Sequence, residues 1–206
     1  EGSWMRLPRE PGTLLGEDDL GPEHLLLRRC LEHARRFPAP AVAFHAPLLA
    51  GRSREARGSD LLNRRTLRQL LTWLGTAKQP DLAVVFVDRD GDRDRQSTIE
   101  RHLEGLQTAP VVIAVAREEF EAWLISDEVS VGKILGRSLP RTPEPEEMNR
   151  LEAKRTLAEW LKDTRPEARR RELRREIAST CDLDVVVERC AAFRAFLDAL
   201  RTASLG

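Results

Sequence analysis

Two aspartates, Asp88 and Asp90, follow an uninterrupted apolar run at residues 82–87. Such a run, rich in valine, is typical of a strand buried on both faces of a parallel sheet. Strand alternation would turn both carboxylates to the same side, where their mutual repulsion is relieved by a cation. Mg²⁺ takes oxygen ligands and is often held by one or two carboxylates together with waters and phosphates. The spacing therefore predicts a divalent metal site.

Two further acidic clusters also follow apolar candidate strands. Glu17, with Asp18 and Asp19, comes after residues 12–16, and Glu118, Glu119 and Glu121 come after residues 111–116. The carboxyl ends of neighbouring parallel strands share one edge of a sheet, where ligands collect. In the first cluster Glu17 is favoured because it is nearest the strand, with Asp18 and Asp19 as alternatives. The second cluster could equally be acids stabilised by a helix dipole.

Strands and helices alternate up to about Asp127, which predicts an α/β fold with about four mainly parallel strands. The four candidate strands lie near residues 12–16, 41–44, 82–87 and 111–116. We expect an α/β domain over residues 12–127 and a helical segment over 128–206 that packs on it, with helices near 147–163, 166–178 and 182–203. The run at 185–187 could form a strand, but the helical stripe that continues beyond it favours a helix.

The composition limits the cellular setting and the partners. No apolar run reaches the length of a membrane-spanning helix and no signal peptide opens the sequence, so we expect a cytoplasmic protein. The three cysteines are scattered, as expected for reduced core residues. With 34 basic and 34 acidic residues, binding to nucleic acid would need a local basic patch. Candidate patches are Arg52, Arg54 and Arg57 in one loop, Arg89, and the arginines of residues 169–175. For the last group, the main expectation is a solvated, salt-bridged helix face, and phosphate contact is the second.

Three of these segments together resemble the Toprim (topoisomerase–primase) domain. They are Glu17 followed by a leucine-rich helix, then Val87-Asp88-Arg89-Asp90, and then Glu119-Phe120-Glu121-Ala122-Trp123-Leu124. More narrowly, residues 14–200 resemble a bacterial branch of Toprim-like proteins of unknown function. The wider group includes nucleases of phage-defence systems that are often paired with an ABC- or SMC-like ATPase. One departure is that the Toprim glutamate is usually followed by glycine, whereas Asp18 follows Glu17.

The resemblance implies a Toprim-like sheet and hydrolysis of phosphodiester bonds in DNA or RNA that depends on Mg²⁺ or Mn²⁺. It assigns catalysis to Glu17, Asp88 and Asp90, with Glu119 and Glu121 as further metal ligands. Lys154 matches a lysine of the family and would contact a phosphate. The implied setting is an effector subunit of a bacterial antiviral defence system, with an ATPase partner and with homodimer formation left open.

Two other functions remain open. Asp88-Arg89-Asp90-Gly91 also resembles the DxDG opening of haloacid-dehalogenase-like phosphatases, in which the first aspartate is a nucleophile. That motif normally follows the first strand of its domain, whereas here it follows the third candidate strand, and no partner lysine is evident at a later strand end. Alternatively, the chain is a non-catalytic interaction module of an ATPase complex that docks through its C-terminal helices.

Overall fold

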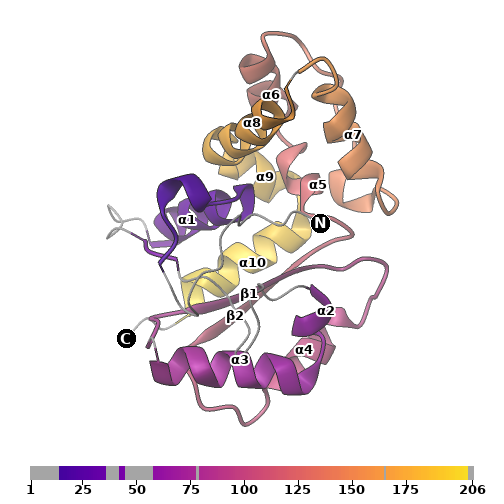
Figure 1. Ribbon diagram of the computed structural model, residues 1–206. Helices are drawn as coiled ribbons and strands as arrows, with labels where there is room; N and C mark the ends of the chain where they lie inside the picture. Colours follow the sequence, from indigo (N-terminus) through magenta and orange to yellow (C-terminus); the bar gives the residue numbers. More distant parts are fainter. Residues whose placement is uncertain (1–13, 36–41, 45–57, 78, 165, 204–206) are drawn as a thin grey trace.

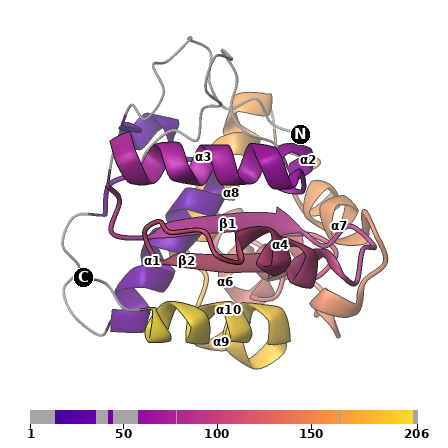
Figure 2. The ribbon, with the colours of Figure 1, turned by 90° about the horizontal axis from the view of Figure 1, so that it is seen from below.

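A small parallel sheet lies between two layers of helices. The computed structural model describes residues 14–35, 42–44, 58–77, 79–164 and 166–203. Strand β1 (Ala83–Asp88) pairs in parallel with β2 (Val111–Ala116), in a register that sets Ala83 opposite Val111 and Asp88 opposite Ala116. Helices α3 (Arg64–Ala77) and α4 (Arg95–Leu103) cover one face of the sheet, and α1 (Pro22–Arg35) and α10 (Ala191–Thr202) cover the other (Figure 1, Figure 2).

The described residues are mostly helical. In addition to the helices named above, they form short 3-10 helices η1 (Glu17–Asp19) and η2 (Pro145–Glu147), and α2 (Gly58–Leu61), α5 (Glu121–Leu124), α6 (Glu128–Leu135), α7 (Glu152–Trp160), α8 (Glu167–Thr180) and α9 (Leu183–Arg189). The mixed α/β class and the parallel pairing predicted from the sequence are confirmed. Among these helices, none is long and apolar enough to cross a membrane.

The expected four-stranded sheet is reduced to two strands in the described part of the chain. The two strands expected before β1 are represented by an isolated bridge at Leu14 and by a hydrogen bond from the Leu15 N–H to the Phe44 carbonyl, at 2.8 Å. Residues 12, 13 and 41 of these two segments lie outside the described residues. Both apolar runs are short, so each offers few ladder hydrogen bonds.

Strand alternation divides the sheet between two cores. Val85 and Val87 of β1 pack with Leu67 of α3 and Ile99 of α4 in the smaller core. The alternate residues of β1 face the larger core, which also contains Val112, Ala114 and Ala116 of β2. Asp88 has the parity of Val84 and Phe86, so its side chain leaves the sheet on the face covered by α1 and α10.

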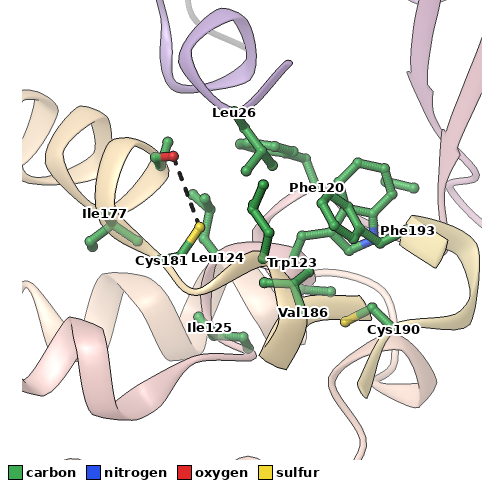
Figure 3. Packing of buried hydrophobic residues seen from close by; sticks show 14 of the residues in the cluster. Leu26, Phe120, Trp123, Leu124, Ile125, Ile177, Cys181, Val186, Cys190 and Phe193 are labelled. Carbon is green, nitrogen blue, oxygen red and sulfur yellow. Dashed lines mark hydrogen bonds between the residues drawn. The ribbon is translucent and has the colours of Figure 1, made fainter. Parts of the chain in front are cut away.

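Trp123 lies at the centre of the larger core. Its fully buried ring makes edge contacts with Phe86 and Phe193 and stacks on Phe196, with ring centroids 6.1 Å apart. Figure 3 shows that Leu26 of α1, Phe120, Trp123 and Phe193 of α10 come together from distant parts of the sequence. The C-terminal helices and the sheet therefore share one continuous core.

A buried carboxylate holds this core together. Glu146, which is 4% exposed, accepts a hydrogen bond from the Trp123 indole N–H at 2.8 Å. It also accepts the backbone N–H groups of Ala192 at 2.9 Å and Phe193 at 3.3 Å. These two groups belong to the first turn of α10, whose N–H groups have no partner within the helix. Glu146 thus fixes the start of α10 against Trp123.

The helix expected over residues 182–203 is divided at Cys190, which has an extended backbone with φ −124° and ψ 101°. The preceding Arg189 donates to the carbonyls of Ser126 and Thr142 and pairs with Glu128. The apolar residues on both sides of Cys190 have helical spacing. These tertiary contacts, together with the Glu146 cap, nevertheless end one helix and begin another there. Residues 185–187 are helical, as predicted. The three cysteines are free and buried, and Cys181 Sγ approaches the Ala178 carbonyl (Figure 3).

Candidate functional site

Asp88 ends β1 and links it to the segment that follows β2. Its Oδ1 accepts the backbone N–H of Phe120 at 2.8 Å, and its Oδ2 lies 3.7 Å from Lys154 Nζ. The chain can turn back after β2 because Glu118 adopts a left-handed conformation, with φ 61°. Burial raises the pKa of Asp88, and the charges of Glu119 and Asp90 raise it further, against the opposing effects of Phe120 N–H and Lys154.

Glu119 connects this segment to helix α7. Its side chain is 3% exposed, and its Oε2 accepts the backbone N–H of Lys154 at 3.1 Å. Its Oε1 lies 3.5 Å from Lys154 Nζ. Glu119 therefore binds both the backbone and the side chain of Lys154, which fixes the first turn of α7 beside Asp88.

The Lys154 ammonium group lies among three carboxylates. It lies within 4 Å of oxygens of Asp88 and Glu119, and it interacts electrostatically with Glu121 in the first turn of α5. Partial burial lowers the pKa of Lys154, but the charges of Glu121, Asp88 and Glu119 outweigh this effect and leave the pKa above its usual value. Lys154 therefore stays charged and partly neutralises the acids around it.

A fourth carboxylate, Glu23 in the first turn of α1, joins this group. Burial raises the pKa of Glu23 and the charge of Asp88 raises it further, whereas Arg174 lowers it. The pKa of Glu121 is raised by burial and by Asp88 and lowered by Lys154 and Arg174. We refer to Glu23, Asp88, Glu119 and Glu121 as the carboxylate cluster. In the sequence Glu23 has only the position of an acid in a helix first turn, because its approach to Asp88 depends on how α1 packs.

The Asp90 carboxylate is held in an ion pair with Arg150. Strand β1 ends at Asp88, so strand alternation does not extend to Asp90, which has a left-handed backbone with φ 55°. Its Oδ1 lies 2.7 Å from Arg150 Nε. The neighbouring Arg89 pairs with Glu118, and these two residues line a hollow of about 250 Å³ together with Arg150. Asp90 affects Asp88 through its charge, while its own carboxylate is held by Arg150.

Glu17 is held on the surface by Arg28. Its two carboxylate oxygens accept hydrogen bonds from the two terminal guanidinium nitrogens of Arg28 at 3.1 and 2.9 Å, and its side chain is 71% exposed. The hydrogen bond from Arg28 lowers the pKa of Glu17, and the charges of Arg28 and Arg175 add to this effect. Among the described residues, no hydrogen bond or ion pair joins Glu17 to Asp88, Glu119 or Lys154. The structure thus brings together Asp88, Glu119, Glu121 and Lys154 of the expected site, without Glu17.

The expected basic groups differ in their surroundings. Arg52, Arg54 and Arg57 lie outside the described residues. Arg89 is paired with Glu118. The run on α8 forms much of the expected salt-bridged face, for example through Arg169 and Glu172 at 3.0 Å. Of the candidates from the sequence that the structure describes, Lys154 is the cation in direct contact with the carboxylate cluster.

The chemistry of the cluster suits a hard divalent cation. In the part of the chain that the structure describes, no three His, Cys, Asp or Glu side chains are close enough to hold an ion by themselves. Mg²⁺ often binds through only one or two carboxylates, with waters and substrate phosphates as its other ligands. Asp88 and Glu119 already share one cationic group, and the raised pKa values of Asp88, Glu23 and Glu121 reflect negative charge that is poorly solvated. The residues therefore fit a Mg²⁺ or Mn²⁺ ion with few protein ligands.

Comparisons with known proteins identify a family for most of the chain. Neither the curated proteins nor the solved structures include a match to it. A family model described as "Domain of unknown function (DUF4276)" matches residues 24–201, which contain Asp88, Glu119, Glu121 and Lys154. This match covers well over half of the 206 residues. The chain therefore belongs to the DUF4276 family.

Proposed function

We propose that this protein is a metal-dependent phosphodiesterase that cleaves nucleic acid. The proposal depends mainly on one observation: Asp88, at the carboxyl end of β1, meets Glu119 and Glu121, from the segment after β2, around Lys154. The Toprim resemblance of the same segments supports this assignment, and a Toprim-like sheet is part of the proposal. The edge of an α/β sheet where strands end is also a common place for a ligand site.

Each residue of the site has a proposed role. Asp88 and Glu119 would hold the divalent ion, which on binding would polarise the phosphate and lower the pKa of an attacking water. Glu121 would take the proton of that water, because a carboxylate with a raised pKa is a better base near neutral pH. The water oxygen then bonds to phosphorus as the bond to the leaving oxygen breaks. Lys154 would offset negative charge near the phosphate.

The proposed setting follows from the resemblance and from the charge balance. The chain has no net charge, so its own attraction for a phosphate backbone is expected to be weak. We propose that an ABC- or SMC-like ATPase partner supplies additional affinity and control. The corresponding role is a cytoplasmic effector of antiviral defence, acting on DNA or RNA.

The test is a cleavage assay with the full chain. Plasmid DNA, linear DNA and RNA are incubated with Mg²⁺, Mn²⁺ or EDTA, alone and with an ATPase partner and ATP. Asp88→Asn keeps an acceptor for the Phe120 N–H and removes the charge, while Asp198→Asn changes an exposed aspartate that pairs with Arg201. We expect metal-dependent cleavage that Asp88→Asn abolishes and Asp198→Asn retains. Cleavage that survives Asp88→Asn in EDTA would contradict the proposal.

A phosphatase is the second candidate, and the position of Lys154 favours it. The ammonium group lies 3.7 Å from Asp88 Oδ2, so a lysine is present beside the first aspartate of the DxDG motif. Against it, the Asp90 carboxylate is already ion-paired with Arg150. Release of phosphate from small phosphoesters, with a phosphoryl group trapped on Asp88 and nucleic acid left intact, would favour this function. An absence of turnover with every substrate would favour the interaction module.

A further inference from the structure

The arginine-rich helix α8 contains one arginine that differs from its neighbours. Arg169 pairs with Glu172, and Arg170 pairs with Glu167, each at 3.0 Å. Arg175 donates to the carbonyls of Glu17 and Asp18, and Arg171 also has an interaction partner. Arg174 has no hydrogen bond or ion pair with another described residue, and its buried Nε lacks a hydrogen-bond partner.

Helix α8 packs beside α1, because Arg29 of α1 donates to the Ala178 carbonyl and Arg175 of α8 donates to carbonyls just before α1. This packing brings Arg174 close enough to the carboxylate cluster to act on it electrostatically. Its charge lowers the pKa values of both Glu23 and Glu121, which belong to two different helices. The cluster is thus approached by two cations, Lys154 from α7 and Arg174 from α8.

The two cations are not equally available to a ligand. The Lys154 ammonium group is shared between Asp88 and Glu119. Arg174 has five N–H donors in a planar group, and none of them is used by the described residues. The carboxylates of the cluster would repel a phosphodiester unless a cation with free hydrogen-bond donors binds its phosphate oxygens. A guanidinium group suits this task because it binds phosphate oxygens through two parallel hydrogen bonds.

We propose that Arg174 binds a phosphate of the nucleic-acid backbone at the carboxylate cluster. This inference rests on the proposed function, because it assigns the substrate contact of that same site. The competing explanation is that Arg174 only neutralises Glu23 and Glu121. In that case its removal would change the stability of the fold without changing the number of phosphates the protein contacts.

The experiment measures binding of a fluorescent oligonucleotide, single- or double-stranded, to the full chain in Ca²⁺ over a series of salt concentrations. Arg174→Gln removes the charge, and Arg174→Lys keeps it but removes the paired donors. Arg169→Gln is the matched control, since it changes an arginine of the same helix that is already paired with Glu172. Thermal melting of each variant gives the stability, and Arg174→Lys is used for the affinity comparison if Arg174→Gln does not fold.

We expect Arg174→Gln to weaken binding roughly tenfold and to reduce the slope of log K against log salt concentration by about 0.7–0.9. Arg174→Lys should keep the slope and bind more weakly than the wild type, because an ammonium group cannot donate in the same paired geometry. Arg169→Gln should bind within about twofold of the wild type.

The outcomes separate this inference from the proposed function. If the wild type binds no oligonucleotide at low salt, either alone or with the ATPase partner, both are overturned. If the wild type binds and cleaves nucleic acid, but Arg174→Gln keeps the slope and Arg174→Lys keeps the affinity, the inference on Arg174 alone is overturned. If Arg174→Gln loses the slope while the wild type binds without cleaving, even with the ATPase partner and ATP, Arg174 is a phosphate-binding residue and the proposed hydrolysis is contradicted.

Discussion

Replacing Lys154 by methionine would keep the aliphatic part of the side chain and remove the ammonium group from the carboxylate cluster. The charge lies 3.7 Å from Asp88 Oδ2 and 3.5 Å from Glu119 Oε1. At these separations a unit-charge contact amounts to about 1 kcal/mol in bulk water and about 4–5 kcal/mol at an effective dielectric constant of about 20. Because the Lys154 side chain is 39% exposed, solvent screening favours the lower value. The two contacts, each contributing slightly more than about 1 kcal/mol, lead us to expect that the unfolding free energy falls by about 2–3 kcal/mol at pH 7.

The sign of the pH dependence provides a second check. The pKa values of Asp88 and Glu121 are already raised in the folded protein, and loss of Lys154 would raise them further. The destabilisation should therefore be present at pH 7 and shrink as the pH falls below the folded pKa values of these acids, where they are protonated. Divalent metal should also raise the melting temperature more in Lys154→Met than in the wild type, because a cation that binds only the folded state stabilises it.

The assay is urea unfolding at pH 7 and pH 4 together with thermal melting in Mg²⁺, Mn²⁺ or EDTA. Lys162→Met is the control, since Lys162 is 55% exposed and pairs only with its helix neighbour Glu159 among the described acids. If Lys154→Met is as stable as Lys162→Met at pH 7, with the same response to metal as the wild type, then Lys154 does not neutralise the cluster and the reasoning is refuted.

Three other substitutions test separate parts of the structure. Glu146→Ala leaves the Trp123 indole N–H and two N–H groups of α10 without their acceptor, so guanidinium unfolding should show a loss of about 3–5 kcal/mol. Glu121→Gln removes an acid whose pKa burial raises, so the variant should melt at a higher temperature than the wild type at pH 7, with the difference gone below about pH 4. Glu17→Gln should lower the unfolding free energy by less than about 1 kcal/mol, because the pair with Arg28 is exposed. Since the pKa of Glu17 is lowered, that small loss should be present at pH 7 and disappear on acidification. Glu17→Gln thus destabilises the protein at pH 7, whereas Glu121→Gln stabilises it.

Local sequence patterns predicted the strands and part of the site because these features depend on nearby residues. The uninterrupted apolar runs gave β1 and β2, and the parallel pairing brings the ends of both strands to one edge. That edge explains why Asp88, Glu119 and Glu121 come together. The motif resemblance singled out Lys154. Local patterns do not predict its contact with Asp88, because the two residues are far apart in the sequence.

The remaining features depend on tertiary contacts that local patterns do not contain. Strand alternation predicted that Asp90 would lie beside Asp88, but it applies only within the strand, and Arg150 binds Asp90 after the strand has ended. Glu23 has the sequence position of an ordinary acid in a helix first turn, and it lies near Asp88 only because of how α1 packs. The break at Cys190 is likewise fixed by contacts of Arg189 with residues 47 or more positions away.

We propose that the carboxylate cluster binds a divalent cation, and anomalous X-ray scattering from crystals grown with Mn²⁺ tests this proposal most directly. The account predicts a manganese peak within about 2–2.5 Å of a carboxylate oxygen of Asp88 or Glu119. The peak should be lost in Asp88→Asn crystals grown under the same conditions. A manganese peak bound elsewhere, or none at saturating Mn²⁺ in crystals of the wild type, would contradict the account.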